Sequence, residues 1–167
     1  AYDTDARAAL AYLKASEHCT GALGVVGICI GGHLAFRAAM NPGVLAVTCF
    51  YATDIHNRGL GAGMNDNTLD RGPELKAEAL MIYGRQDPHV PLEGRQKVQA
   101  ALVAAGTHFT WHEFNGAHAF MRDEGYRYDP ELALQCYRLT LDLFRRKLGE
   151  GDRTDVANNT GAAETKH

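Results

Sequence analysis

The sequence predicts an α/β fold, in which a mostly parallel β-sheet lies between layers of helices in a three-layer sandwich. The main observation is that short apolar runs of strand length alternate with longer segments of helical periodicity. Such alternation is typical of parallel strands joined by right-handed helical crossovers. A second observation is the glycine-rich turn at residues 27–32, which joins an apolar run directly to a helical segment. A chain of 167 residues that is 46% hydrophobic is long enough for one domain with a substantial core.

The first half of the chain begins with a predicted helix over residues 3–17. A buried strand is expected at 23–28, followed by a helix at 32–41 that ends at an Asn-Pro-Gly sequence. Apolar and β-branched residues predict the next strand at 45–51. The glycine-rich stretch at 57–72 has little periodicity, so we expect it to lead to the following strand without regular structure.

The second half of the chain continues the alternation. Residues 79–83 are expected to form a strand, and residues 91–105 a helix that begins with proline and is followed by glycine. Another strand is predicted at 109–114. The last helix is predicted at 130–148, because an Asp-Pro pair opens it and its apolar residues share one face.

Composition limits the kinds of partner that the protein can have. Residues 1–149 are expected to form a single partial domain, and residues 150–167, which are polar and lack periodicity, a disordered tail. The formal net charge of -3 argues against nucleic acid or an anionic membrane surface as a partner. The sequence shows neither a signal peptide nor a membrane-spanning segment, so we expect a soluble, cytoplasmic protein.

The four cysteines have no metal-type spacing, and we expect neither a metal nor another cofactor. Cysteines this sparse are most simply reduced. Cys19, Cys49 and Cys136 lie in or beside apolar stretches, which is typical of small core residues.

Cys29 differs because it occupies the centre of the glycine-rich turn at 27–32, which has the form of a nucleophile elbow. We expect Gly27 and Gly31 to let strand and helix approach, and residue 29 to be held in a strained conformation with its side chain exposed. The start of a helix favours the thiolate form of a cysteine, so Cys29 is a candidate nucleophile. The alternative is an ordinary strand-to-helix turn with a small buried cysteine.

Two further candidates follow later strands. Asp87 comes after the strand at 79–83, and His118 comes after the strand at 109–114. Because the carboxyl ends of parallel strands share one sheet edge, both should lie near Cys29. The order nucleophile, acid, base is that of α/β hydrolases, in which the imidazole moves the proton and the carboxylate orients it. Taken singly, Asp87 can simply initiate a turn, and His118 can be an ordinary loop histidine.

The other histidines are weaker candidates. His33, on the first helical turn after the elbow, either lines the pocket or packs against the helix face. His89 can reach the rim of the site because it is close to Asp87. His18 and His56 are expected to be solvated.

Three segments together resemble the dienelactone hydrolase family, whose members are cysteine enzymes of the α/β-hydrolase fold. The matching segments are residues 27–32, 84–91 and 116–120, and the resemblance extends over about 5–148.

The resemblance implies hydrolysis of a small lactone or ester substrate, of the carboxymethylenebutenolide type, through a thioester acyl-enzyme. Cys29 would attack the carbonyl carbon, His118 would act as base and then acid, and Asp87 would orient it. The backbone N–H of Ile30, the residue after the nucleophile, would supply one oxyanion donor.

Arg122 occupies the position at which dienelactone hydrolases carry an arginine that holds the substrate carboxylate. A guanidinium suits this task, although a solvated loop cation in an Arg-Asp-Glu sequence is an equal alternative. Ala119 departs from the serine that some members have, so the exact pocket chemistry can differ.

Compared with the family, the chain starts inside the helix that precedes the elbow strand, so it looks like a C-terminal portion. We therefore expect the contiguous half of the sheet, with the elbow strand at an unprotected edge. Association into a homo-oligomer through this edge is one expected consequence.

Three alternatives stay open. A general small-ester carboxylesterase would use the same residues. Class I glutamine amidotransferases have a similar cysteine elbow, but their catalytic histidine is followed two residues later by Glu, where this chain has Phe120. A non-enzymatic, hydrolase-like fragment is the third.

Overall fold

The structure of the protein is organised around a central parallel sheet. It is a computed structural model, and it describes residues 2–57, 59–61 and 63–149. The tail predicted at 150–167 lies outside the described residues. The sheet contains four strands, and all of its pairings are parallel. In spatial order they are β1 (Leu23–Ile28), β2 (Val44–Phe50), β5 (Glu78–Gly84) and β6 (Phe109–Phe114).

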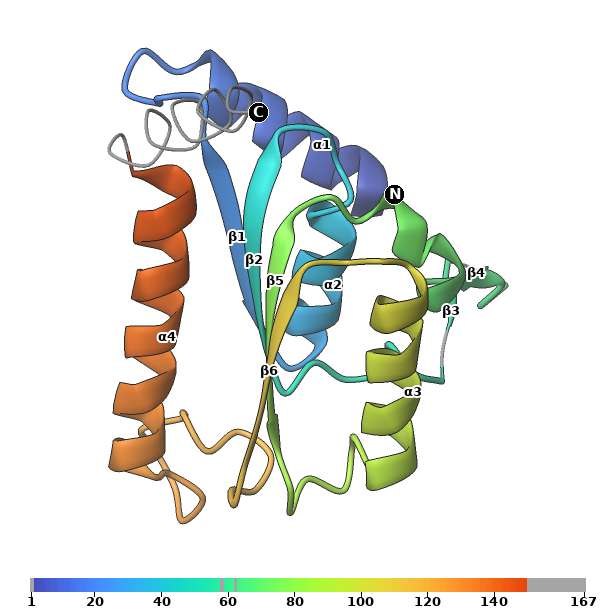
Figure 1. Cartoon of the computed structure of the whole chain (residues 1–167), viewed down its shortest axis with the longest axis vertical. Helices are drawn as coiled ribbons and strands as arrows, with labels where there is room; N and C mark the ends of the chain where they lie inside the picture. The colour runs from blue at the N-terminus through green and yellow to red at the C-terminus, as the bar shows by residue number, and fades with distance from the viewer. Residues whose placement is uncertain (1, 58, 62, 150–167) are drawn as a thin grey trace, which may run out of the picture.

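Helices cover both faces of this sheet. They are α1 (Tyr2–Ala15), α2 (Ile30–Ala38), α3 (Leu92–Ala104) and α4 (Pro130–Leu148). Figure 1 shows α4 alone on one face and α2 and α3 together on the other. This arrangement confirms the predicted three-layer α/β sandwich. Among the described residues, no helix combines the length and the apolar character needed to cross a bilayer.

The core is divided by the sheet into two clusters, because successive strand residues point to opposite faces. In β2, Val47 and Cys49 pack toward the α2 and α3 side, whereas Ala46 and Phe50 pack toward α4. Cys136 of α4 is fully buried in the second cluster. The prediction that Cys49 and Cys136 are core residues is therefore confirmed.

Strand β1 lies at an edge of the sheet, as expected. Its described pairing is with β2 alone, and this pairing extends to Ile28 opposite Phe50. The residues Val26 and Ile28 on this strand are 52% and 50% exposed.

The segment between β2 and β5 is more regular than the sequence predicted. It contains a short antiparallel pair, β3 (Gly59–Leu60) with β4 (Asp66–Asn67), and a 3-10 helix, η1 (Leu69–Glu74). A Cβ at Gly59 would lie 2.4 Å from the carbonyl oxygen of Met64, so only glycine allows this close pairing. Elements this short leave no periodic signal in the sequence.

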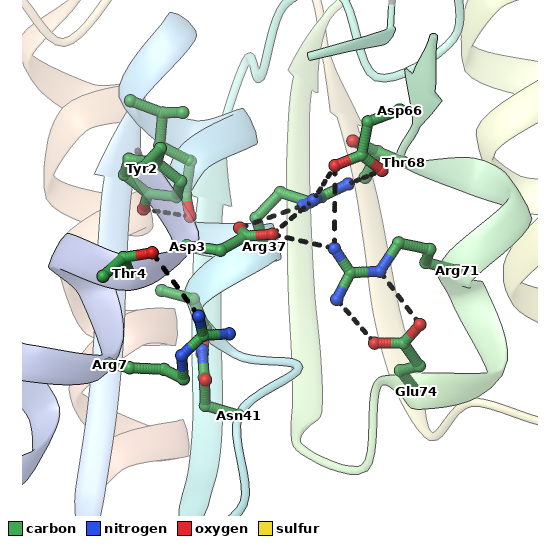
Figure 2. A network of polar contacts seen from close by, with 12 residues as sticks. Tyr2, Asp3, Thr4, Arg7, Arg37, Asn41, Asp66, Thr68, Arg71 and Glu74 are labelled. Atoms are coloured by element: carbon green, nitrogen blue, oxygen red, sulfur yellow. Dashed lines mark hydrogen bonds and ion pairs between the residues drawn. The ribbon is translucent and has the colours of Figure 1, made fainter. Parts of the chain in front are cut away.

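A network of ion pairs fastens this segment to α2 (Figure 2). The guanidinium of Arg37, on α2, is almost completely buried and donates to Asp3 of α1 at 2.6 Å and to Asp66 of β4 at 2.5 Å. Arg71 of η1 donates to Asp3 at 2.9 Å and to Glu74 at 2.6 Å. The hydrogen bond from Arg37 is the main reason that the pKa values of Asp3 and Asp66 lie below their usual range. Four elements are thereby joined around the helix that begins at the elbow.

Candidate active site

Cys29 forms the turn between β1 and α2, and its backbone has a conformation that residues with a side chain rarely adopt. Its φ is 58° and its ψ is -128°. Its N–H donates to the carbonyl of Phe50 at 3.0 Å, and its carbonyl accepts from the N–H groups of Gly32 at 2.9 Å and Thr53 at 3.3 Å. Hydrogen bonds to β2 and its following loop thus stabilise the strained elbow that the sequence predicted.

Two glycines make this elbow possible, but they are not both the predicted ones. A Cβ at Gly27 would lie 2.0 Å from the carbonyl oxygen of Gly31, so Gly27 is required, as expected. A Cβ at Gly31 would meet none of the described heavy atoms outside its own helix within 4 Å, so the expectation that residue 31 must lack a Cβ is wrong. The second close contact is at Gly32, where a Cβ would lie 2.8 Å from the Cβ of Ala52. The loop after β2, which the sequence does not place there, creates this restriction.

Ile30 follows Cys29 directly and is the first residue of α2. The helix begins at Ile30, closer to the elbow than the predicted start at residue 32. The first N–H groups of a helix have no acceptor within it and carry partial positive charge. The N–H of Ile30 is one of these first helical N–H groups, so it is a candidate oxyanion donor.

Asp87 lies in the turn after β5, with its side chain fully shielded from solvent. One carboxylate oxygen, Oδ1, accepts from the backbone N–H of His89 at 2.8 Å. The other, Oδ2, is 2.7 Å from Nδ1 of His118. Each oxygen is thus bound by a donor, and the carboxylate has a fixed direction.

The loops after β5 and β6 are joined by backbone contacts. The N–H of Arg85 donates to Phe114 at 2.7 Å, and the N–H of Gln86 donates to Gly116 at 3.0 Å. A Cβ at Gly84 would lie 2.3 Å from the carbonyl oxygen of Gly116, so the two loops touch where β5 ends. This contact brings Asp87 and His118 together.

His118 connects the carboxylate to the thiol. Its Nε2 is 3.3 Å from Sγ of Cys29, while its Nδ1 is bonded to Asp87. Because the carboxylate accepts the proton on Nδ1, Nε2 is left as an acceptor toward the thiol. The three predicted residues therefore form one hydrogen-bonded chain of thiol, imidazole and carboxylate. Such a chain can transfer a proton from sulfur to nitrogen.

Two aromatic rings contact the imidazole of His118. The ring of Tyr51 lies 5.1 Å from it and the ring of His89 lies 4.6 Å from it, both at an interplanar angle of 66°. The prediction that His89 reaches the rim of the site is confirmed. The role of Tyr51 was missed, since in sequence it is only the last residue of a predicted strand. Burial raises the pKa of Tyr51 to about 12, so this ring stays neutral.

The other cysteines lack the features of Cys29. Burial raises the pKa of the Cys136 thiol to about 12, and that of Cys49 still further. Cys19 is half-buried, and its sulfur accepts from the N–H of Gly21 at 3.3 Å. Cys29, by contrast, is hydrogen-bonded to the imidazole of His118.

Two histidines are buried away from the triad. His33 is fully buried with Nε2 2.6 Å from Oγ1 of Thr68, which confirms helix-face packing. Its pKa is lowered to about 4, mainly by burial and secondly by the positive charge of Arg37. The prediction that His56 is solvated is wrong, since it is 8% exposed. It packs so closely on α3 that a Cβ at Gly94 would lie 2.7 Å from its ring.

Arg122 lies at the surface in the turn after His118. Its side chain is 65% exposed and forms a long ion pair, 4.0 Å, with Glu124. The turn is made by Ala119, whose φ of 62° is unusual for a residue with a side chain. The structure therefore describes a solvated loop cation close in sequence to the triad. In the described parts of the chain, no group of three or more His, Cys, Asp or Glu residues has the arrangement of a metal site.

A family model and the named relatives of this chain agree on one protein family. The model of the dienelactone hydrolase family matches residues 1–148. A Saccharomyces cerevisiae protein named "Putative carboxymethylenebutenolidase" is 43% identical over 132 residues, which are 75% of this chain and 48% of that protein. A carboxymethylenebutenolidase from Pseudomonas putida is 31% identical over 139 residues, 83% of this chain and 54% of that protein. The chain spans about half the length of the curated relatives it matches.

Solved structures agree on the fold. The crystal structure of a "Putative Dienelactone Hydrolase from Klebsiella pneumoniae" superposes with a TM-score of 0.78 at 22% identity, and covers 86% of this chain and 60% of that one. A dienelactone hydrolase-like promiscuous phosphotriesterase from metagenomic libraries superposes with a TM-score of 0.71 at 20% identity, covering 89% of this chain and 62% of that one. At these identities the likeness concerns the fold alone, which is the α/β-hydrolase fold.

Proposed function

The chain belongs to the dienelactone hydrolase family, and from this premise we propose that it hydrolyses a small lactone or ester with Cys29 as nucleophile. The observation that carries the proposal is the position of His118. Its two ring nitrogens lie 3.3 Å from the thiol of Cys29 and 2.7 Å from the carboxylate of Asp87.

In the first half of the proposed reaction, His118 accepts the thiol proton on Nε2 and the thiolate attacks the carbonyl carbon. A C–S bond forms, and the carbonyl oxygen becomes an oxyanion beside the N–H of Ile30. When the tetrahedral intermediate collapses, the C–O bond to the alkoxide breaks. The imidazolium then gives its proton to the departing oxygen, which leaves a thioester on Cys29.

In the second half, water attacks the thioester: an open-chain ester has by then released its alcohol, whereas a lactone keeps the freed hydroxyl on its acyl chain. His118 removes a proton from the water, whose oxygen attacks the thioester carbonyl. The C–S bond breaks, and the sulfur is released as thiol after it takes back the proton. In both halves Asp87 stabilises the imidazolium and keeps Nε2 directed at the sulfur.

The proposed substrate is a lactone that carries a carboxylate. Two arguments support it: relatives of this chain are named carboxymethylenebutenolidase, and Arg122 presents an exposed guanidinium in the turn that follows His118. A guanidinium can bind a carboxylate through two parallel hydrogen bonds. A general small-ester esterase would not need this contact, so substrate charge distinguishes the two possibilities.

The proposal is tested by activity and by trapping the intermediate. Cys29→Ala should abolish hydrolysis, whereas the control Cys19→Ala should retain it. Asp87→Asn should lower kcat by roughly 10³- to 10⁴-fold, because the wrong imidazole tautomer would face the thiol. Acid quenching during turnover, followed by mass spectrometry, should find the acyl group on the peptide that contains Cys29. Full activity of Cys29→Ala, or no hydrolysis of any lactone or ester by the unmodified protein, would refute the proposal.

A further inference from the structure

The ring of His118 is held by more than its two hydrogen bonds. The bonds to Asp87 and Cys29 act through the two ring nitrogens, which both lie in the ring plane. Hydrogen bonds of this kind fix where the nitrogens are, but they restrain weakly the tilt of the ring about the line between them. The two ring contacts, from Tyr51 and His89, restrain that tilt.

Tyr51 provides a fixed wall on the protein side. It is 1% exposed, its backbone N–H donates to Ile82 at 2.6 Å, and its ring also packs at 5.3 Å against Phe120. A backbone hydrogen bond from Met121 further anchors its hydroxyl. This ring cannot move without disturbing the core.

His89 approaches from the solvent side on a firmly held backbone. Its side chain is exposed, yet its N–H donates to Asp87 at 2.8 Å. The next residue, Val90, is fully buried, and its carbonyl accepts from the guanidinium of Arg95 at 2.8 Å. The imidazole of His89 is therefore exposed but sits on a fixed backbone, and its ring centre lies 4.6 Å from that of His118. It is the second ring, besides Tyr51, that contacts His118.

We propose that the side chain of His89 is a positioning residue for His118, an inference that rests on the proposed function. Its ring keeps the imidazole of His118 in the tilt that directs Nε2 at the sulfur of Cys29. Because the bond to Asp87 comes from the backbone of His89, side-chain substitutions leave that bond in place. The effect of the His89 ring on catalysis can therefore be measured separately from the effect of the turn that holds Asp87.

The first experiment compares His89→Ala with His89→Phe. Removing the ring should lower kcat on a small neutral ester by about two- to tenfold with little change in KM, the range expected for one aromatic contact. Phenylalanine keeps an aromatic ring without its nitrogens, so it should restore kcat to within about twofold. His18→Ala, which alters an exposed histidine elsewhere, is the matched control and should leave both constants unchanged. A change confined to KM, or a loss in His89→Phe equal to that in His89→Ala, would overturn the proposal.

A second readout needs no substrate. The rate at which iodoacetamide alkylates Cys29 at pH 7 reports how well His118 accepts the thiol proton. Both His118→Ala and His89→Ala should slow this alkylation, and His89→Phe should restore the rate. If the protein hydrolyses no ester but shows this pattern, the proposed function fails while the inference about His89 stands. An unchanged alkylation rate in His89→Ala would overturn the inference, whatever the hydrolytic activity.

Discussion

Mild acid should destabilise the fold through His33, and His33→Gln should remove this effect. The imidazole is fully buried on α2, with Nε2 2.6 Å from the hydroxyl of Thr68. Burial, and after it the charge of Arg37, lowers its pKa from 6.5 to about 4. Glutamine can bond to Thr68 but does not titrate.

The size of the effect follows from the two pKa values. Above pH 6.5 the ring is neutral in both folded and unfolded chains, so the full stability is present. Between pH 6.5 and 4 the imidazole of His33 is protonated in the unfolded chain but stays neutral in the folded chain, so the free energy of unfolding decreases. Linkage gives a loss of about 2.5 kcal/mol between pH 7.5 and pH 4.5 from this group.

The measurement is urea unfolding at pH 7.5 and 4.5, followed by the fluorescence of Trp111. Other groups, including His56, titrate in both proteins and cancel in the comparison. The unmodified protein should therefore lose about 2.5 kcal/mol more than His33→Gln on acidification. His18→Gln, a change at an exposed histidine, should lose as much as the unmodified protein. Equal losses in His33→Gln and the unmodified protein would refute the reasoning.

Three further predictions concern the site. Brief iodoacetamide treatment and peptide mapping should find Cys29 labelled before any other cysteine; faster labelling elsewhere would contradict its assignment as nucleophile. Gly32→Ala should destabilise the fold by about 1–3 kcal/mol and lower activity, because the new Cβ would lie 2.8 Å from that of Ala52, whereas Gly31→Ala meets open space and should be tolerated. Arg122→Ala should lower kcat/KM for an anionic lactone by roughly 10- to 100-fold and leave a neutral ester of the same size nearly unaffected. Equal losses on both substrates would indicate a structural role for Arg122.

The elements with local signals could be predicted from the sequence. The strand at 23–28 and the helix at 130–148 have the predicted bounds. The first is a short apolar run, and the second has an Asp129 side chain that accepts from Leu132 at 3.0 Å to start the helix. The proximity of Cys29, Asp87 and His118 could also be predicted, because parallel strands place their following loops at a common edge.

Features that depend on contacts between distant segments could not be predicted. Nothing near Gly32 in sequence indicates the contact with Ala52, so the restriction at Gly32 was missed. Nothing near His56 indicates its packing on α3, so His56 was wrongly expected to be solvated. The burial of Arg37 depends on carboxylates supplied by Asp3 and Asp66 from other elements. In each case the restriction is steric or electrostatic, and its partner is defined only once the chain has folded.

The order of the strands in the sheet also determines when the chemistry becomes possible during folding. β1, β2, β5 and β6 follow one another in space as they do in the chain, so the sheet can grow in one direction as the polypeptide is synthesised. Cys29 follows the first strand and His118 follows the last, 89 positions later. A nascent chain therefore carries the Cys29 thiol without the imidazole of His118 beside it until β6 docks. Fast alkylation of Cys29 in a refolding experiment would thus report the docking of β6, and not merely formation of the elbow.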